Sequence, residues 1–270
     1  MDPLAATGGI FYFDDENRLV HAGTCFAFRT PLSALTARHC LAEDRTYFVL
    51  FPGGGGFDNV LTIERHPTAD IAVMWLEGSR QKVEELGGDS DAAFFADGVS
   101  DLSLGDDFMS YGFPSEGPAE RAENGPIPRF FKGYFQRFYA VTQNDSNYEA
   151  VELSIPAPGG LSGAPLFRPG SRDMVMGLVT ASATSFAVEE RIDEVDEHGH
   201  RLRVETNRVI TYGIGLLLGG VKDWLDEFAA KPSGDSALQQ WTTKKPRIPD
   251  SIWRRQIALV PEATYPGGKS

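Results

Sequence analysis

The stretch Gly159-Gly160-Leu161-Ser162-Gly163-Ala164-Pro165-Leu166 places one serine inside a glycine-rich turn, directly before an apolar segment. A serine hydroxyl is a weak nucleophile and needs a general base beside it. Glycines around the serine let backbone N–H groups point at a developing oxyanion, which is worth about 3 kcal/mol per donor. Because such a turn is often only a turn, the prediction of a catalytic serine depends on residues elsewhere in the chain.

Two earlier stretches supply the missing residue types. Leu35-Thr36-Ala37-Arg38-His39-Cys40 brings a histidine to the end of a predicted strand, and Ala69-Asp70-Ile71-Ala72-Val73 puts an aspartate at the start of another. A histidine titrates near neutrality and can take the serine proton and pass it to a leaving group. A carboxylate on the far ring nitrogen fixes the imidazole tautomer. A lone histidine or aspartate means little, but in the chain order His39, Asp70, Ser162 they predict a catalytic triad.

The rest of the chain is punctuated by 29 glycines and 17 prolines, with short apolar segments rich in Phe, Val, Ile and Thr between them. Many short strands with regular turn signals predict an all-β barrel or sandwich. The clearest strand candidates are residues 9–13, 24–28, 47–51, 71–76, 151–155 and 175–180. Helical spacing of apolar residues predicts a helix over residues 221–230 and a weaker one over 81–86.

Together these stretches resemble the chymotrypsin-like serine peptidases. Thr36-Ala37-Arg38-His39-Cys40 is similar to the family's Thr-Ala-Ala-His-Cys box. Residues 70–73 are similar to its Asp-Ile/Leu-Ala-Leu/Val strand, and residues 160–166 are similar to its Gly-Asp-Ser-Gly-Gly-Pro-Leu box. Residues 177–180 resemble the strand that pairs with the substrate backbone, and Tyr212-Gly213-Ile214-Gly215 the closing strand before a C-terminal helix. The resemblance covers about residues 8–230. The interval of 31 positions between residues 39 and 70 is similar to bacterial HtrA-type and related cytoplasmic members.

The resemblance implies two six-stranded antiparallel β-barrels with a C-terminal helix. The expected divisions are 1–100 with His39 and Asp70, 101–230 with Ser162 and the helix, and a basic tail over 231–270. It also implies that His39 is the general base, Asp70 its orienting residue, and the backbone N–H groups of Gly160 and Ser162 the oxyanion hole. The substrate-binding residues that it implies are Pro156, Thr180, Ala181, Ser182 and Gly213.

Three positions depart from the family pattern. Leu161 stands where many members carry an aspartate that pairs with a freed N-terminus, so activation by that route is not expected. Pro156, six residues before the serine, is not acidic, so we expect a small or medium apolar side chain in the primary pocket, which Gly213 leaves open, rather than Lys or Arg. Cys40 matches a family cysteine, but Cys25 does not sit on its usual partner position, so a bonded and an unbonded pair both remain open.

The formal net charge of −13 makes nucleic acid a poor partner. No apolar run approaches the roughly 20 residues of a membrane span, and Met1-Asp2-Pro3-Leu4 begins no secretory signal, so we expect a cytoplasmic protein. No cofactor or metal is expected, because two cysteines are too few for a thiolate zinc site and His198-Gly199-His200 lacks a third ligand at a fixed spacing.

Two charged segments remain. Residues 189–205 alternate apolar and polar side chains around an acidic run, which predicts a protruding hairpin that could attract basic substrates in a salt-dependent way. The tail, with a net charge of about +4, is expected to lie on the acidic body or to bind a regulatory partner.

The sequence therefore predicts a serine endopeptidase that cleaves polypeptides through an acyl-enzyme. The alternative is an inactive binding protein with a peptidase fold, since a fold alone does not fix function. An α/β-hydrolase esterase needs the order Ser, Asp, His and a helix after the serine motif, neither of which this sequence provides.

Overall fold

The computed structural model describes residues 3–51, 57–77, 95–98, 102–115, 127–143, 146–195 and 201–230. The weaker helix predicted over 81–86, the His198-Gly199-His200 turn and the basic tail 231–270 lie outside these residues. Within them, no helix is long and apolar enough to cross a membrane.

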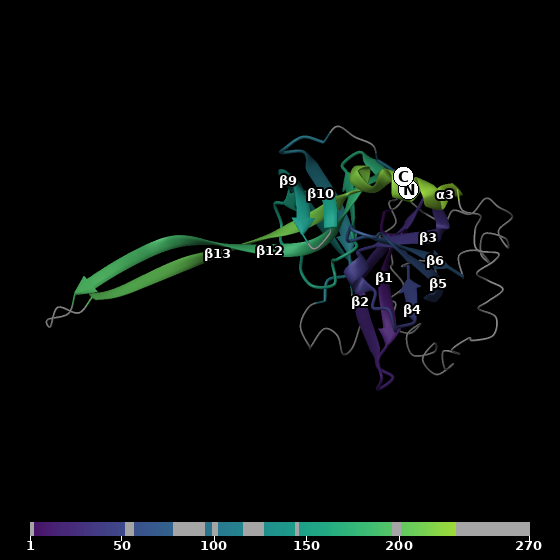
Figure 1. The fold of residues 1–270 in the computed structure, drawn as a ribbon, viewed down its shortest axis with the longest axis horizontal. Coiled ribbons are helices and arrows are strands. Elements are labelled where there is room, and N and C mark those ends of the chain that lie inside the picture. The colour runs from purple at the N-terminus through teal and green to yellow at the C-terminus, as the bar shows by residue number, and fades with distance from the viewer. Residues whose placement is uncertain are drawn as a thin grey trace, which may run out of the picture.

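The N-terminal half of the described chain closes into a barrel of six strands (Figure 1). The strands are β1 (Thr7–Phe13), β2 (Leu19–Phe28), β3 (Thr30–Thr36), β4 (Tyr47–Leu50), β5 (Phe57–Arg65) and β6 (Ala72–Leu76). They pair antiparallel in the order β1-β2-β3-β6-β5-β4. Period-two alternation turns Ile10, Phe26, Leu35 and Met74 into the core, where their side chains are fully buried.

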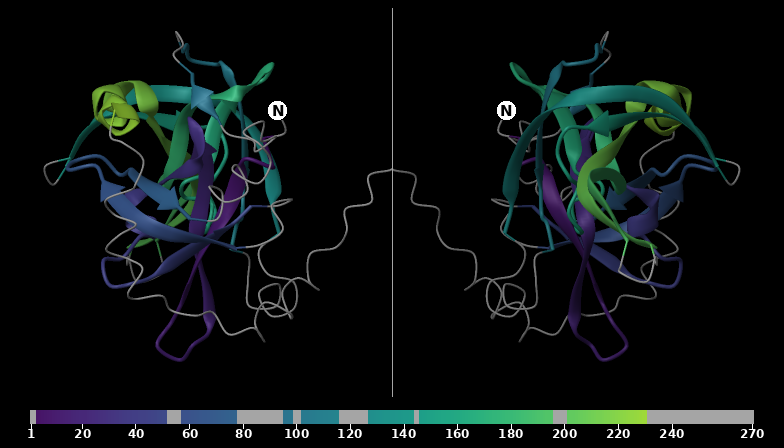
Figure 2. Two further views of the ribbon diagram at one scale, coloured as in Figure 1. Left: turned by 90° about the vertical axis from the view of Figure 1, so that its right-hand side faces the viewer. Right: turned by 90° about the vertical axis from the view of Figure 1, so that its left-hand side faces the viewer.

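The C-terminal half forms a second sheet beside the barrel (Figures 1 and 2). Its strands are β7 (Ala96–Asp97), β8 (Asp107–Gly112), β9 (Arg129–Gln143), β10 (Ser146–Leu153), β11 (Pro165–Arg168), β12 (Ser171–Val195) and β13 (Arg201–Leu217). Their order is β11-β8-β9-β10-β13-β12-β7, and a further β11–β12 pairing brings the two sides of the sheet together. The all-β, chymotrypsin-like fold predicted from the sequence is confirmed, with the short parallel strand β7 as an addition.

The last two strands extend far beyond the sheet that they complete (Figure 1). They remain paired from Gly177 opposite Leu217 out to Val195 opposite Arg201. The protruding hairpin predicted over 189–205 is confirmed, and it is longer than the charged run alone indicated.

After β13 the chain forms a short 3-10 turn, η2 (Leu218–Val221), and the helix α3 (Lys222–Ala230), which confirms the predicted helix. Val221 and Leu225 are its buried contacts with the core. A short helix is stabilised mainly by the packing of its apolar face rather than by its intrinsic helix propensity.

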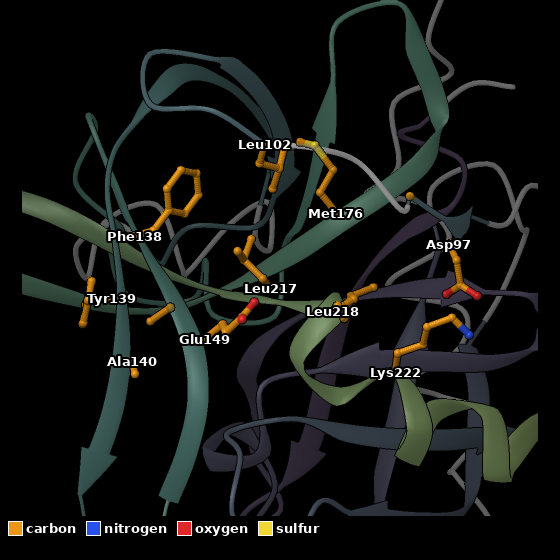
Figure 3. Close-up of a pocket in the computed structure, with 13 residues that line it drawn as sticks. Asp97, Leu102, Phe138, Tyr139, Ala140, Glu149, Met176, Leu217, Leu218 and Lys222 are labelled. Atoms are coloured by element: carbon orange, nitrogen blue, oxygen red, sulfur yellow. The ribbon is translucent and has the colours of Figure 1, made fainter.

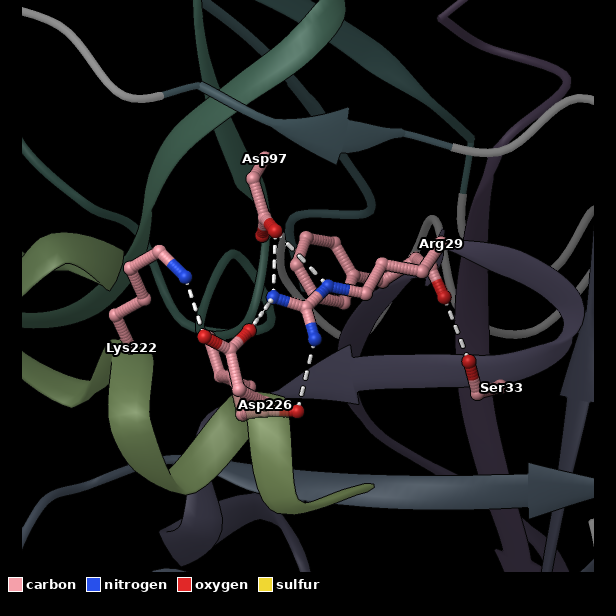
Figure 4. A network of polar contacts seen from close by, with 7 residues as sticks. Arg29, Ser33, Asp97, Lys222 and Asp226 are labelled. Carbon is pink, nitrogen blue, oxygen red and sulfur yellow. Dashed lines mark hydrogen bonds and ion pairs between the residues drawn. The ribbon is translucent and has the colours of Figure 1, made fainter. Parts of the chain in front are cut away.

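Arg29, in the turn between β2 and β3, fastens this helix to the first barrel (Figure 4). Its guanidinium donates to Asp97 Oδ2 at 2.5 and 2.9 Å, to the Leu225 carbonyl at 2.9 Å and to Asp226 Oδ1 at 2.6 Å. Lys222 pairs with the same Asp226 carboxylate from one helical turn away. One side chain thus joins the first barrel, β7 and α3.

Cys25 and Cys40 are both buried and both free, so the unbonded alternative is the one that the structure adopts. Burial raises the pKa of the Cys25 thiol well above its ordinary value, and the nearby Cys40 adds to this. Cys25 therefore acts as a small apolar core residue.

Candidate active site

Two antiparallel strands of the first barrel bring the predicted histidine and aspartate together. β3 ends at Thr36, opposite Ala72 of β6, and the one-turn helix η1 (Arg38–Cys40) follows β3 directly. Asp70 precedes β6 at the same end of the barrel. His39 therefore reaches Asp70 through local chain geometry, although 31 positions separate them.

The Asp70 carboxylate holds His39 at two points. Its Oδ2 lies 2.7 Å from His39 Nδ1, and its Oδ1 accepts the backbone N–H of His39 at 3.0 Å. The hydrogen bond to Asp70 raises the pKa of His39 above its ordinary value of about 6.5, and Cys40 contributes next. The pairing also leaves Nε2 as the ring nitrogen that is not engaged by Asp70.

The predicted serine sits in a turn that requires its glycines. The Leu161 N–H donates to the Pro158 carbonyl at 3.1 Å, and Gly160 in the third position of this turn has φ +84°. A Cβ on Gly160 would lie 2.6 Å from the Phe113 carbonyl oxygen, and one on Gly163, at φ +89°, would clash with the Thr24 carbonyl. The left-handed backbone and the close approach exclude larger residues at both glycines.

The serine turn packs against the segment that carries His39. The Ser162 carbonyl accepts the Thr24 N–H at 2.9 Å and the Cys40 thiol at 3.7 Å. The Ser162 hydroxyl, however, donates to the Thr180 carbonyl at 3.2 Å, and among the described residues no hydrogen bond joins it to the His39 ring. The structure thus brings His39 and Asp70 into direct contact and places Ser162 beside them without a bond to the histidine.

Thr24 of β2 fixes the orientation of the serine turn through the hydrogen bonds of its hydroxyl. Its hydroxyl donates to the Gly160 carbonyl at 2.7 Å and accepts the Phe113 N–H at 3.0 Å, and its side chain is fully buried. The Gly159 carbonyl is held in the same way by the Ser115 N–H at 2.5 Å. The carbonyls of Gly159 and Gly160 are thus hydrogen-bonded, whereas the N–H groups of Gly160 and Ser162 donate to no acceptor among the described residues. These are the donors that an oxyanion hole needs.

Thr24 was not predicted from the sequence. It lies 136 positions from Gly160, and its only local signal is a hydroxyl between Gly23 and Cys25 in the otherwise apolar run 22–28.

Leu161 anchors the turn in the second core. It is 1% exposed and packs in the cluster that contains Leu153 and Ala164. An apolar anchor thus occupies the position at which many chymotrypsin-like peptidases carry a carboxylate.

Pairwise contacts link the five predicted substrate-binding residues to the serine or to one another's chain neighbours. Thr180 accepts the Ser162 hydroxyl, and Ser182, two residues later on β12, is the cross-strand partner of Gly213. The Gly213 N–H donates to the Ile155 carbonyl at 2.6 Å. Pro156 follows Ile155 directly and is exposed, and Ala181 lies between Thr180 and Ser182.

A separate cavity of about 740 Å³ lies where β9, β10 and η2 meet β7 (Figure 3). Its lining includes Leu102, Phe138, Met176, Leu217 and Lys222, and His39, Asp70 and Ser162 do not contribute to it. The candidate catalytic residues are instead at the junction of the first barrel with the serine turn.

A fold of two β-sheets with a histidine, a carboxylate and a serine at their junction is that of the chymotrypsin-like peptidase class. The chain belongs to the family of the trypsin-like peptidase domain, whose family model matches residues 23–178.

Solved structures show the same fold. The protease Rv3671c from M. tuberculosis in its active form is 15% identical, with a TM-score of 0.57 over 83% of this chain and 81% of its own. Its inactive form gives a TM-score of 0.55 at the same identity, over 83% of this chain and 89% of its own. The HtrA-type protease AlgW with a decapeptide is 14% identical, with a TM-score of 0.52 over 79% of this chain and 61% of its own. No curated protein matches the sequence.

Proposed function

We propose that this protein is a serine endopeptidase in which Ser162 is the nucleophile, His39 the general base and Asp70 the residue that orients and stabilises His39. The observation that carries the proposal is the pair of hydrogen bonds from His39 to Asp70, beside a serine turn in which the Gly160 and Ser162 N–H groups donate to no acceptor in the part of the chain that the structure describes. Membership of a peptidase family supports the same reading.

In the proposed reaction the Ser162 hydroxyl first turns from the Thr180 carbonyl towards His39 Nε2. Ser162 Oγ then bonds to the scissile carbonyl carbon while its proton passes to Nε2. The imidazolium gives this proton to the leaving amine as the C–N bond breaks, which leaves an acyl-enzyme. Water deprotonated by His39 then releases the acid and frees Ser162.

The Gly160 and Ser162 N–H groups would donate to the carbonyl oxygen as it becomes an oxyanion. Loss of one such donor typically costs about a hundredfold to a thousandfold in rate. Thr24 and Ser115 would keep these donors in place before substrate arrives, because they hold the carbonyl oxygens of the same turn.

The surroundings of the proposed primary pocket favour an uncharged side chain. The contacts that join Ile155, Ala157, Ser182 and Gly213 are made by backbone groups and a hydroxyl, with no ionisable side chain among them. An uncompensated Lys or Arg would be costly to bury there. We therefore extend the proposal to cleavage after small or medium apolar residues.

One observation favours the alternative of an inactive binding protein, namely the Ser162 hydroxyl bonded to Thr180 and not to His39. Hydrolysis of fluorescently labelled casein separates the two functions. The wild-type protein should cleave casein, Ser162→Ala and His39→Ala should not, and Ser103→Ala, at an exposed serine outside the site, should match the wild type. Equal release by the wild type and Ser162→Ala would contradict the proposal.

A further inference from the structure

Strand β12, which passes the serine, has an edge that no described strand covers along most of its length. From Thr180 onward, β12 pairs only with β13 among the described residues, and its other edge carries no strand. This edge begins beside Ser162 and runs to Val195, a length of about 50 Å at the usual rise per residue. A free edge offers unpaired N–H and C=O groups to any extended chain.

The hairpin also exposes apolar side chains near its base. Phe186 is 70% exposed and lies opposite Val209, which is 57% exposed, and Val188 and Ile210 are exposed nearby. A ribbon of two strands is marginally stable in water, and a third strand would cover part of this surface. The hairpin therefore has the features of a binding surface rather than of a self-sufficient structure.

The side chains of the two hairpin strands differ in charge. Between Phe186 and Val195, β12 carries four carboxylates and one arginine, whereas β13 carries three arginines and one glutamate between Arg201 and Thr211. Arg191 pairs with Glu205 and Asp193 with Arg203, each at 2.8 Å across the ribbon. Glu190 forms no ion pair with any basic residue that the structure describes. A chain that pairs with the β12 edge would therefore lie beside the acidic side chains of residues 189–194.

We infer that the free edge of β12 binds an extended, basic segment of the polypeptide substrate by adding it as a third strand. The inference rests on the proposed function, which sets the scissile bond at Ser162. Antiparallel pairing is the more stable arrangement, and it directs the part of the substrate before the scissile bond along the hairpin. Its basic residues would then lie about 8 to 14 positions upstream of that bond.

A second copy of this chain is a weaker occupant for the same edge. Two β12 edges would oppose carboxylates to carboxylates, and like charges directly opposite are destabilising. Pairing of β12 with the β13 edge of another copy would satisfy the charges, but it is a head-to-tail contact that continues into an open assembly.

The test uses Ser162→Ala protein, which cannot consume its ligand, and fluorescein-labelled 20-residue peptides of one common sequence. One peptide carries four lysines near its N-terminal end, one carries four glutamates at the same positions, and one carries the lysines near its C-terminal end. Fluorescence anisotropy should show about tenfold tighter binding of the first peptide than of the second. This preference should shrink at 1 M salt, where the screening length is about 3 Å.

Two matched variants locate the binding surface. Glu189→Gln/Glu190→Gln/Asp193→Asn should remove the preference for the lysine peptide, whereas Arg201→Gln/Arg203→Gln/Arg208→Gln on the other edge should keep it. Equal effects of the two variants, or tighter binding of the C-terminal lysine peptide, would overturn the inference. So would association in sedimentation velocity that depends on protein concentration and that the β12 variant abolishes, because copies of the chain would then occupy the edge.

Failure of the inference can be told apart from failure of the proposed function. Casein hydrolysis without any preference among the peptides would support the peptidase function and refute the binding of basic segments along β12. A peptide preference without casein hydrolysis would leave a binding edge on an inactive protein and refute the substrate role inferred for it.

Discussion

At the scale of single residues, Thr24 connects the serine turn to the first barrel. It reaches from the first barrel into the second sheet and holds the Gly160 carbonyl through its hydroxyl. Because it also accepts the Phe113 N–H, removal of the hydroxyl leaves that buried N–H and the partly buried Gly160 carbonyl without their partner.

Thr24→Val should therefore lower kcat by about tenfold to a hundredfold, since the oxyanion donors lose their fixed orientation. Thr24→Ser keeps the hydroxyl and should restore most of the activity. Thr7→Val is the control, because Thr7 is equally buried and its hydroxyl donates to the Pro3 carbonyl at 2.8 Å, far from the turn. Casein hydrolysis and thermal unfolding of the three variants check this, and an equal loss of kcat in Thr24→Val and Thr7→Val would contradict it.

The raised pKa of His39 predicts the pH dependence of the reaction. The base must be neutral to accept the serine proton, so kcat/KM should fall as the pH drops through a value above 6.5. Asp70→Asn removes the main cause of the raised His39 pKa. The acidic limb of the kcat/KM profile should therefore move to lower pH, and the maximal rate should fall strongly. The rate of inactivation by a fluorophosphonate, measured from pH 5 to 10, gives both profiles. An unchanged limb in Asp70→Asn would show that another group controls the rate.

The same shift has an effect of the opposite sense on stability. A histidine with a raised folded-state pKa stabilises the fold below its unfolded pKa of about 6.5, and this contribution is lost as the pH rises through the folded value. The pH of greatest stability and the pH of greatest activity should therefore differ.

At the scale of elements, the position of α3 depends on Arg29 as well as on apolar packing. Arg29 has φ +59°, a conformation that asparagine tolerates. Arg29→Asn should therefore remove the contacts to Asp97 and α3 without adding backbone strain.

We expect Arg29→Asn to lower the free energy of unfolding by about 1–2 kcal/mol. Arg18→Asn, at an exposed arginine that pairs with Asp14 and Glu16, should change it by less than about 0.5 kcal/mol. Urea unfolding measures both values, and hydrogen exchange should be faster in α3 of the Arg29 variant alone. Equal unfolding curves for the two variants would contradict the assigned role.

The outer part of the β12–β13 hairpin projects beyond the two cores, to which only its base contributes. Among the residues that the structure describes, none from Ala181 to Tyr212 belongs to either buried cluster. Joining Ala183 to Tyr212, which are cross-strand partners, through Asn-Gly should leave the unfolding free energy within about 1 kcal/mol of the wild type. Urea unfolding of the shortened chain tests this, and a larger loss would mean that the hairpin supports the fold.

At the scale of the whole molecule, the sequence predicted what short stretches encode. The triad candidates lie in motifs of five to eight residues. Alternation and turn residues predicted the all-β fold and its hairpin, and helical spacing of apolar residues predicted its last helix. Thr24 and Arg29 could not be predicted, because their roles come from contacts 136 and 197 positions away, as with Gly160 and Asp226. The state of Cys25 and Cys40 also depended on three-dimensional geometry, which the sequence left open.

Peptidase activity at the proposed site requires that His39 and Asp70 activate Ser162. Labelling of the folded protein with a fluorophosphonate, followed by mass spectrometry of the modified peptide, tests it most directly. The proposed triad predicts a single adduct on Ser162 that is absent in Ser162→Ala and strongly reduced in His39→Ala and Asp70→Asn. An unlabelled Ser162 in folded protein, or labelling that persists at full rate without His39, would contradict it.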